Sequence, residues 1–471
     1  MQEKESIIDI SGLTPDQKKV FEELRDYVSN RYDDSVYVIK GWAGTGKTYS
    51  VSVFIRYMLN VMYPDRKWFK VAMTGPTNKS VRVIKKATGL KNKRVTYQTI
   101  HKLLGLKERI TIEGKQEFVN SGEFIPPINS VKVLVIDEVS MLNDDLFNMI
   151  LKYRDKLKII CMGDPAQIPP VGKPDCIPFR DELAEVYKIK ILPLRTIMRQ
   201  KEGNPIIESS VRIRKNLGSE RIPLELETSL IEGKEGIEFL NLNLLDTRKR
   251  FADILEKYLH SKEFKEDPEF VKIIAWRNKT VAHMNDLSRR IIFGDESQEG
   301  KILPGEKLIA NNPIIQGETI IFNTNDEFKV KDYTVSTDKF VTDGIECKIK
   351  IYETTVISLD EDDNEYEVDI EILHEEDEFE FKRIANILKE RAIEQRGKNK
   401  SWLKYYNFLR RYADVGYGYA ITAHKSQGST YSFAFVLEDD IDMNSNVVER
   451  NRIKYTAYTR ASKKLYVLKR M

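Results

Sequence analysis

Short apolar runs alternate with helical patterns along the first third of the chain. Strands are expected where apolar residues follow one another, at 36–40, 70–74, 131–136 and 158–162. A helix is expected from near Thr14, with Pro15 in its first turn and apolar residues at helical spacing behind it. Glycine or polar residues follow each strand. This pattern predicts an α/β fold, in which a parallel sheet carries helices on both faces and binds ligands at the carboxyl ends of its strands.

The rest of the chain changes character several times. Residues 109–119 alternate in polarity around a Gly-Lys turn and predict a β-hairpin. A second region of strands and helices starts near Glu269 and resumes at Tyr419. Between these two points the sequence is first rich in short alternating runs, at 301–372, and then helical, charged and aromatic, at 375–412. The simplest division is a second α/β domain that is interrupted by an inserted β domain with a helical arm.

Composition places the chain among globular proteins. Hydrophobic residues make up 41% of the 471 residues and aromatic residues 10%, which is too much for a disordered or fibrous chain. Three cysteines argue against a disulfide scaffold, and no Cys/His cluster suggests zinc. No run of about 18 apolar residues predicts a membrane span, and the N-terminus lacks the pattern of a signal peptide. A soluble cytoplasmic protein without membrane partners is therefore expected.

The charge of the chain is unevenly distributed. The net charge is only +3, but residues 360–380 contain 13 acidic residues and no Lys or Arg, so the remainder is basic. A basic charge outside this tract is typical of a protein that binds polyanions. Charged, solvent-exposed faces on an ordinary enzyme would explain the same charge. We interpret the acidic tract first as a solvated strand edge. Two alternatives stay open. The acidic residues could repel a polyanion beside its binding channel, or they could form a docking surface for a basic partner.

Residues 41–48 read Gly-Trp-Ala-Gly-Thr-Gly-Lys-Thr and match the pattern G-x-x-x-x-G-K-[ST]. Glycines let backbone N–H groups wrap a phosphate, and the N-terminus of the following helix adds partial positive charge. The pattern predicts that Lys47 reaches the β- and γ-phosphates of a nucleotide and that the Thr48 hydroxyl ligates Mg²⁺. The residues expected to contact the nucleotide are Gly41, Ala43, Gly44, Thr45, Gly46, Lys47 and Thr48.

The apolar run at 131–136 ends in two carboxylates, Asp137 and Glu138. A strand that ends in this way presents Asp137 to the metal ion and leaves Glu138 placed to polarise an attacking water. Together with the glycine-rich motif, this pair indicates hydrolysis of a nucleoside triphosphate. The two motifs leave open what the hydrolysis drives.

Further motifs follow in the order that is found in superfamily 1 helicases. Residues 163–171 resemble motif III, residues 420–430 motif V and residues 455–461 motif VI. The five motifs cover nearly the whole chain, which is most similar to the Dda-like branch of superfamily 1B, related to RecD and the Pif family. The resemblance implies two RecA-like P-loop domains, ATP and Mg²⁺ as ligands, and translocation from 5′ to 3′.

The resemblance also implies roles for single residues. Gln167 would contact the γ-phosphate region, and Arg199 and Arg460 would reach the γ-phosphate across an interdomain cleft, since a guanidinium pairs phosphate oxygens bidentately. Gln17 resembles the glutamine that reads adenine in this family, which makes ATP the expected nucleotide. Outside the motifs, Gln17 and either arginine would be taken for ordinary surface residues. The implied catalytic residues are Lys47, Glu138, Gln167, Arg199 and Arg460.

Contacts to DNA are implied by three segments. Residues 75–80 resemble motif Ia, residues 99–101 resemble motif Ib, and motif V completes the set. Backbone N–H groups, hydroxyls and basic side chains can hold phosphates without reading base sequence. A lone histidine is usually structural, so that alternative stays open for both histidines in these segments. The implied contacts are Pro76, Thr77, Lys79, Thr99, His101, Thr422, His424 and Lys425.

The architecture of the family implies three domains. Residues 1–193 would form the first RecA-like domain, with a β-hairpin pin at about 105–128, and residues 194–300 with 412–471 the second. Residues 301–411 would form an SH3-like β domain with a helical tower that braces the pin. In this family the pin splits the duplex, and Phe118 is the candidate for stacking against the separating base pair. Packing of Phe118 into its own domain is equally open, and for residues 401–412 core packing is favoured over stacking on nucleic acid.

The sequence therefore predicts a monomeric ATP-dependent DNA helicase that binds single-stranded DNA and forked duplexes. Single-strand-binding or replication proteins are candidate partners, and the cytoplasm of a prokaryote or of a phage-infected host is the expected location. Two alternatives stay open. One is an ATP-switched factor that loads or displaces proteins on DNA without strong unwinding, and the other is an RNA-directed motor.

Overall fold

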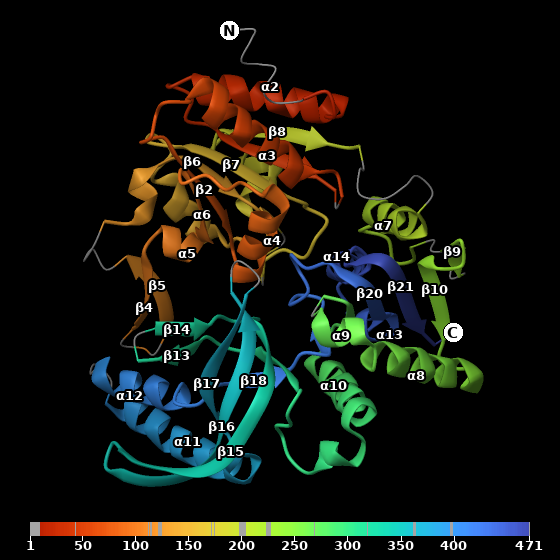
Figure 1. The fold of residues 1–471 in the computed structure, drawn as a ribbon. Coiled ribbons are helices and arrows are strands. Elements are labelled where there is room, and N and C mark those ends of the chain that lie inside the picture. Colours follow the sequence, from red (N-terminus) through yellow and green to blue (C-terminus); the bar gives the residue numbers. More distant parts are fainter. Residues whose placement is uncertain are drawn as a thin grey trace. The chain divides into compact units, whose positions relative to one another are not determined.

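The structure is a computed structural model, and its chain divides into two units (Figure 1). Unit 1 comprises Met1–Gly105, Gly122–Asn243 and Ser426–Met471, and unit 2 comprises Leu106–Ser121 and Leu244–Lys425. The division into three domains stays a prediction. The residues that the structure describes are 10–42, 44–111, 113, 115–120, 125–170, 172–173, 175–196, 204–222, 228–267, 269–317, 319–360, 364–395 and 399–470.

A six-stranded, fully parallel sheet forms the first part of unit 1. All four strands that the apolar runs predict are present in it, and they are flanked by two strands, β3 and β8, that the pattern did not predict. β8 contains Pro193, which lacks an N–H donor, and it lies at the end of the strand order, where that donor is not required. The order is β3 (Val95–Thr99), β2 (Lys70–Gly75), β6 (Val131–Ile136), β7 (Lys158–Gly163), β1 (Val36–Gly41) and β8 (Ile189–Leu194).

Helices cover this sheet, and the first of them begins where the sequence predicts. In α2 (Pro15–Ser29) the Thr14 side chain accepts from the backbone N–H of Gln17, and Pro15 occupies the first turn. The helix after the glycine-rich turn is α3 (Lys47–Tyr57), which continues as a π-helical turn, Met58–Met62. Apolar side chains of α2 and α3 pack on strands β1, β2, β6 and β7 in one buried core. The other helices of this part are α4 (Asn78–Thr88), α5 (Ile100–Leu103) and α6 (Asp144–Leu151).

The second part of unit 1 is built on β20 (Tyr431–Leu437), β21 (Ala461–Lys469), β10 (Glu235–Asn241) and β9 (Ser229–Ile231). β20, β21 and β10 run parallel, and β9 pairs with β10 in the antiparallel direction. The helices of this part are α7 (Pro205–Lys215), α13 (Glu438–Asp442) and α14 (Val447–Tyr458). Tyr455 and Tyr458 of α14 are among the largest fully buried side chains, so this helix lies inside the unit.

Unit 2 contains a five-stranded antiparallel sheet in the predicted β-rich insert. Within the described residues its order is β17 (Glu365–Leu373), β16 (Ile345–Leu359), β15 (Glu327–Thr342), β12 (Lys307–Ala310) and β18 (Val415–Tyr417). β17 is a terminal strand with alternating exposure, which confirms the solvated strand edge for this part of the acidic tract. Unit 2 also contains β13 (Ile314–Gln316), β14 (Thr319–Phe322), and the parallel pair β11 (Val271–Ala275) and β19 (Ala420–Thr422).

Two helices pack on the long strands of this insert. Ile384 and Leu388 of α11 (Glu378–Glu394) and Phe408 of α12 (Asn399–Leu409) join one core with residues of β16. Trp402 and Phe408 are buried, so core packing is confirmed for these aromatic residues of the 401–412 segment. Unit 2 also contains α8 (Leu245–Leu259), α9 (Lys262–Glu266) and α10 (Asn278–Phe293).

The predicted hairpin is present as two antiparallel strands, β4 (Leu106–Ile110) and β5 (Gln116–Asn120). The alternation of the sequence sets its register, in which Glu108 lies opposite Phe118. Within unit 2, β4 contacts α12 (Figure 1). In the part of the chain that the structure describes, no helix combines the length and the apolar character that crossing a bilayer requires.

Candidate functional site

The glycine-rich turn joins β1 to α3 and requires glycine at two positions. Gly46 has a φ of +75°, which L side chains rarely adopt, and a Cβ added there would lie 2.7 Å from Nε2 of Gln17. A Cβ added at Gly41 would lie 2.6 Å from Oγ1 of Thr45. The turn therefore folds tightly at the N-terminus of α3, where backbone N–H groups attract anions. Ala43 lies outside the described residues.

Lys47 is the first residue of α3 and bends back over this turn. Its Nζ donates to the carbonyl oxygens of Gly41 at 2.9 Å and Trp42 at 3.0 Å. The hydroxyl of Thr45 donates to the same Trp42 carbonyl at 2.9 Å. The ammonium group is thus held over the turn by two neutral acceptors, which phosphate oxygens would replace with stronger, charge-assisted hydrogen bonds.

Gln17 connects α2 to the turn. Its Oε1 accepts from the backbone N–H of Thr14 at 3.0 Å, and its Nε2 donates to the carbonyl of Thr45 at 3.1 Å. The side chain is 1% exposed, so both ends of the amide are fixed by the protein. An amide retains one further donor and one further acceptor, which are the groups that recognition of adenine requires. That role stays a prediction.

Thr48 and Asp137 meet at the carboxyl end of β6. The Thr48 side chain lies near enough to the Asp137 carboxylate to oppose the rise in its pKa, and the backbone N–H of Glu138 donates to Asp137 Oδ1 at 2.9 Å. Burial, followed by the charge of Glu138, raises the pKa of Asp137 to about 7, against the opposing effect of Lys47. A hydroxyl beside a carboxylate forms an oxygen donor set of the kind that Mg²⁺ prefers, so these two residues fit the predicted ion.

The described residues contain no group of three His, Cys, Asp or Glu side chains that could hold a metal ion. A cation at Thr48 and Asp137 would therefore take its other ligands from nucleotide phosphates and water. This is how Mg²⁺ is usually bound in phosphoryl-transfer sites.

Glu138 has an unusual backbone conformation. Its φ of +50° and ψ of +43° lie in the left-handed region, which costs a non-glycine residue about 1 kcal/mol or more. Such strain persists where the surrounding structure imposes it and is concentrated at functional sites. The side chain is half-buried next to Asp137. Its position directly after the Asp137 carboxylate is the one that the sequence predicts for a catalytic base.

Gln167 of the motif III segment is buried with one group unsatisfied. The residue is 3% exposed, and its Oε1 has no hydrogen-bond partner among the residues that the structure describes. A buried acceptor without a partner is rare in proteins, and it fits a residue that completes its hydrogen bonds with a ligand or water. The next residue, Ile168, accepts at its carbonyl from Nε2 of Gln427, at 2.9 Å, so motif III and the end of motif V are in contact.

Arg460 is buried in its own part of unit 1. Its Nε donates to the carbonyl of Thr456 at 2.9 Å, its Nη1 to the carbonyl of Ser429 at 3.0 Å, and its Nη2 to Oγ1 of Thr459 at 3.1 Å. The residue is 5% exposed. Contact with a γ-phosphate would require the guanidinium to exchange some of these partners. The second predicted arginine, Arg199, lies outside the described residues.

A buried ionic cluster that the sequence motifs did not predict lies between motifs III and VI. Arg214 of α7 forms an ion pair with Asp164, which is fully buried, and Asp164 also accepts from the Tyr455 hydroxyl at 2.5 Å. The Arg214 guanidinium lies 5.1 Å from the ring centroid of Trp42, in the glycine-rich turn. Asp164 and Tyr455 belong to recognised motifs, whereas nothing in the sequence distinguishes Arg214 from the other basic residues of α7.

Five of the predicted DNA contacts lie at the carboxyl ends of two neighbouring strands of unit 1, namely Pro76, Thr77, Lys79, Thr99 and His101. Thr77 caps α4 after β2, and its Oγ1 accepts from Ser80 N at 3.1 Å, while Thr99 caps α5 after β3. Gly75 and Thr99 are register partners, so the carboxyl ends of β2 and β3 bring these segments together. His101 is half-buried, and burial lowers its pKa. Lys79 lies within 5.3 Å of the ring centroid of Tyr431.

The other predicted DNA contacts are in unit 2. Thr422 ends β19, and its Oγ1 accepts from the backbone N–H of Lys425 at 3.2 Å. The Lys425 ammonium donates to Asn311 Oδ1 at 3.0 Å, and burial lowers its pKa. His424 is half-buried, and Phe118 on β5 exposes 49% of its surface.

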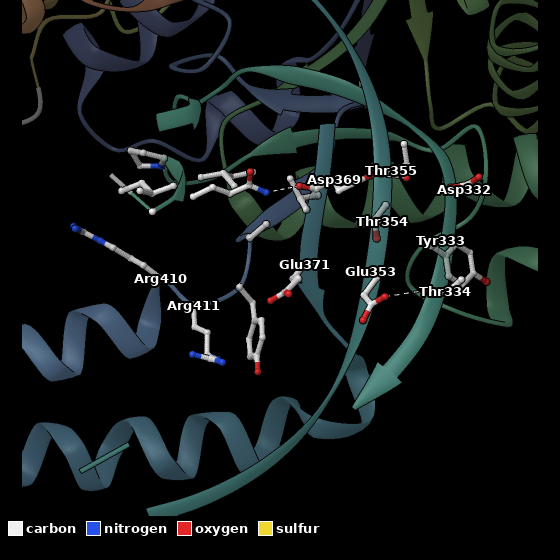
Figure 2. Close-up of a pocket in the computed structure, with 18 residues that line it drawn as sticks. Asp332, Tyr333, Thr334, Glu353, Thr354, Thr355, Asp369, Glu371, Arg410 and Arg411 are labelled. Carbon is white, nitrogen blue, oxygen red and sulfur yellow. Dashed lines mark hydrogen bonds between the residues drawn. The ribbon is translucent and has the colours of Figure 1, made fainter. Parts of the chain in front are cut away.

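A cavity of about 590 Å³ lies elsewhere in unit 2, between β13, the sheet β15–β17 and the end of α12 (Figure 2). Glu353, Asp369 and Glu371 come from its sheet side, and Arg410 and Arg411 come from the end of α12. None of the residues that the sequence predicts for ATP or DNA contact lines it.

Comparisons with known proteins agree with these motifs. Residues 25–173 match the family model of an AAA domain, and residues 417–468 match the UvrD-like helicase C-terminal domain. Protein R530 of Acanthamoeba polyphaga mimivirus is 28% identical, over 95% of this chain and 98% of its own length. The ATP-dependent DNA helicase dda of Enterobacteria phage T4 is 23% identical, over 90% of this chain and 92% of its own.

The similarity extends to an archaeal protein and to solved structures. MJ1519 of Methanocaldococcus jannaschii is 25% identical over 96% of this chain, which spans 38% of that protein's length. The Pif1 helicase from Candida albicans superposes with a TM-score of 0.48 at 17% identity, over 97% of this chain and 94% of that chain. Pif1 from Bacteroides, in complex with ADP-AlF3 and ssDNA, gives 0.46 at 17% identity, over 96% and 92%.

Arg214→Met should destabilise unit 1, because it leaves the buried Asp164 carboxylate without its cation. We expect a loss of about 3–5 kcal/mol in the free energy of unfolding, measured by urea denaturation at neutral pH. Arg214→Lys keeps the charge without the planar guanidinium and should lose less. Unfolding of the Met variant at the same urea concentration as the unaltered chain would contradict the importance of this ion pair.

Proposed function

We propose that the chain is an ATP-dependent DNA helicase of the Dda- and Pif-related branch of superfamily 1B, which translocates 5′ to 3′ on single-stranded DNA and unwinds duplexes ahead of it. The observation that supports the motor best is the arrangement inside unit 1. The turn with Lys47, the Thr48–Asp137 pair and the strained Glu138 converge on one nucleotide site. Gln167, with its unsatisfied acceptor, belongs to the same unit.

In the proposed hydrolysis step, each residue acts on the phosphates or on water. Lys47 leaves the two carbonyls that hold it and binds the β- and γ-phosphates. Glu138 accepts a proton from the attacking water, while Gln167 uses its unsatisfied Oε1 to orient that water or the γ-phosphate. Arg199 and Arg460 stabilise the charge that develops in the transition state. Mg²⁺ bound at Thr48 and Asp137 would supply electrostatic neutralisation of the phosphates.

Coupling to movement follows from contacts that depend on the nucleotide. Binding of ATP favours the arrangement in which Arg460 exchanges its present carbonyl partners for phosphate oxygens, and hydrolysis removes that preference. The segments after β2 and β3 hold one part of the strand, and the segment after β19 holds another. When these two sets of segments bind the strand tightly in turn, the protein moves along it.

Strand separation is assigned to the hairpin of β4 and β5. Phe118 is half-exposed on β5, which suits stacking against the last base pair of a duplex. A pin must resist the force of translocation, and β4 is supported within unit 2 by contact with α12. The insert of β12 and β15–β18, with its helices, therefore acts as a brace for the pin.

The polarity and the unwinding activity can be tested with tailed duplexes. We expect single-stranded DNA to stimulate ATP hydrolysis strongly and unwinding to start from a 5′ tail, because the strand passes through the protein in one direction. A duplex with a 3′ tail of equal length is the control. Stimulation without unwinding would favour an ATP-switched factor that displaces proteins, and stimulation by RNA alone would favour an RNA-directed motor.

Glu138→Gln should abolish turnover and preserve binding, because the amide keeps the shape of the side chain but cannot accept the proton. We expect kcat to fall by about 10²–10⁴-fold, with ATP and DNA affinity retained. Lys47→Ala serves as the contrasting variant, which should lose ATP binding as well. Full turnover by Glu138→Gln in a steady-state phosphate-release assay would remove Glu138 as the catalytic base.

Phe118→Ala should lower duplex unwinding more than movement on single strands, since stacking of one base is worth roughly 1–3 kcal/mol. Phe118→Tyr retains an aromatic face and should retain most of the unwinding rate. The measurement compares unwinding of a 5′-tailed duplex with the rate of translocation on an oligonucleotide without a duplex. Equal losses in both assays would show that Phe118 does not act at the fork.

A further inference from the structure

A basic surface with one exposed indole lies at the amino ends of three strands of unit 1. It consists of Arg66, Lys67, Trp68, Lys70, Lys91, Lys93 and Lys132, and we refer to it as the amino-end surface. These residues precede or begin β2, β3 and β6. The segments of motifs Ia and Ib follow the other ends of β2 and β3. The strands run parallel, so the surface lies at the sheet edge opposite to those segments.

Hydrogen bonds hold the parts of this surface together. Arg94 donates from Nη1 to the carbonyl of Tyr63 at 2.6 Å and from Nη2 to the carbonyl of Leu59 at 2.8 Å, which ties the segment before β3 to the segment before β2. The rings of Tyr63 and Phe69 stack with centroids 4.2 Å apart and form a firm base for the turn between them. The surface is therefore a built part of the fold.

Trp68 is the aromatic centre of the surface. It exposes 57% of its surface, and the Arg66 guanidinium and the Lys132 ammonium lie 5.6 Å and 6.0 Å from its ring centroid. In residues 63–70, 91–95 and 130–133 it is the single large apolar side chain that is exposed. An indole without other exposed apolar side chains around it is a poor core for a protein interface, which requires a cluster of apolar contacts that become buried together.

The cations of the surface are not neutralised by the protein. No ion pair joins Arg66, Lys67, Lys70, Lys91, Lys93 or Lys132 to a carboxylate of the described residues, and Asp65 is the one acidic residue in segments 63–70 and 91–94. Cations around an exposed aromatic ring are the combination that binds single-stranded nucleic acid, through phosphate contacts and stacking of a base.

We propose that the amino-end surface binds a second segment of single-stranded DNA, the strand that unwinding releases. The inference rests on the proposed unwinding function, because that activity produces two single strands close to the protein and only one of them occupies the motif Ia and Ib segments. A β-strand of six residues is about 20 Å long, so the amino and carboxyl ends of the β-strands form separate sites. Held at the second site, the released strand cannot anneal behind the motor.

Binding to forks tests this assignment. The full chain is titrated, without nucleotide, into a duplex with a 5′ tail and into the same duplex with both tails, each tail being oligo-dT. The unaltered chain should bind the fork more tightly. Trp68→Ala should lower the affinity for the fork by roughly 5- to 100-fold, the equivalent of one lost base stack, and leave affinity for the single-tailed duplex unchanged. Trp68→Phe should restore most of the difference.

Pairs of lysine substitutions distinguish the effect of the amino-end surface from the effect of lowering the protein's total positive charge. Lys67→Ala with Lys70→Ala should reduce the preference for the fork and its dependence on salt, whereas Lys249→Ala with Lys257→Ala, two exposed lysines of α8, should change neither. ATP hydrolysis stimulated by a short single strand should be the same in every variant. Unchanged stimulation also shows that the variants are folded.

Three outcomes would overturn the proposal. Affinity for both duplexes could fall together in Trp68→Ala, or the fork preference could persist in that variant. A polyglutamate peptide could compete with the second tail as well as free oligo-dT does, which would assign the surface to an acidic protein segment. Failure of the proposed function is distinguishable, since the unaltered chain would then show no stimulation of ATP hydrolysis by DNA, and the inference would fall with it.

Discussion

The turn between β1 and α3 brings backbone and side chains closer together than any residue except glycine allows, and the nucleotide site depends on this closeness. A side chain at Gly46 would displace Gln17, and one at Gly41 would displace Thr45. With glycine in place, Lys47 lies over the turn and Thr48 reaches the carboxylate of Asp137. Residues from α2, α3 and β6 are therefore positioned by a single tight turn, and loss of that turn would separate them all.

A buried ionic cluster around Asp164 connects further segments of unit 1 to the candidate site. Asp164 is completely buried, and its interaction with Arg214 and Tyr455 offsets the cost of removing a carboxylate from water. The cluster connects motif III, α7 and motif VI, and through the ring of Trp42 it contacts the turn itself. A change at the nucleotide can thus reach α14 through groups that are already in contact. Arg460, which follows α14, is held by carbonyl oxygens that are weaker partners than phosphate.

Because its strands run parallel, the first sheet has all its carboxyl ends on one side and all its amino ends on the other. The two sides carry different chemical groups. The carboxyl ends bear the glycine-rich turn, the Asp137–Glu138 pair and the segments of motifs Ia and Ib, because all these segments follow strands. The amino ends bear cations around Trp68 that form no ion pair within the described residues. Residues at this edge are free of the constraints of catalysis, so a basic surface there has to be explained by solubility or by a second polyanion. The exposed indole favours the second polyanion.

Local sequence patterns were sufficient to predict much of the secondary structure and several residues of the candidate site. The four apolar strands, the capped helix at Thr14, the phosphate-binding turn and the hairpin could be predicted from sequence, because each is determined by residues within a few positions of one another. The β-rich insert and its helices were recognised for the same reason. The insert's individual strands and their order could not be derived, since strand pairing joins residues far apart along the chain.

Tertiary structure alone decided which distant groups meet. Arg214 is 50 residues from Asp164, and no periodicity marks it as that carboxylate's partner. Burial of Arg460 among backbone carbonyls, the unsatisfied acceptor of Gln167 and the edge position of β8 with Pro193 likewise depend on neighbours that the chain supplies from elsewhere. A sequence motif specifies which chemical groups are present, whereas their hydrogen-bond partners and exposure are set by packing between segments.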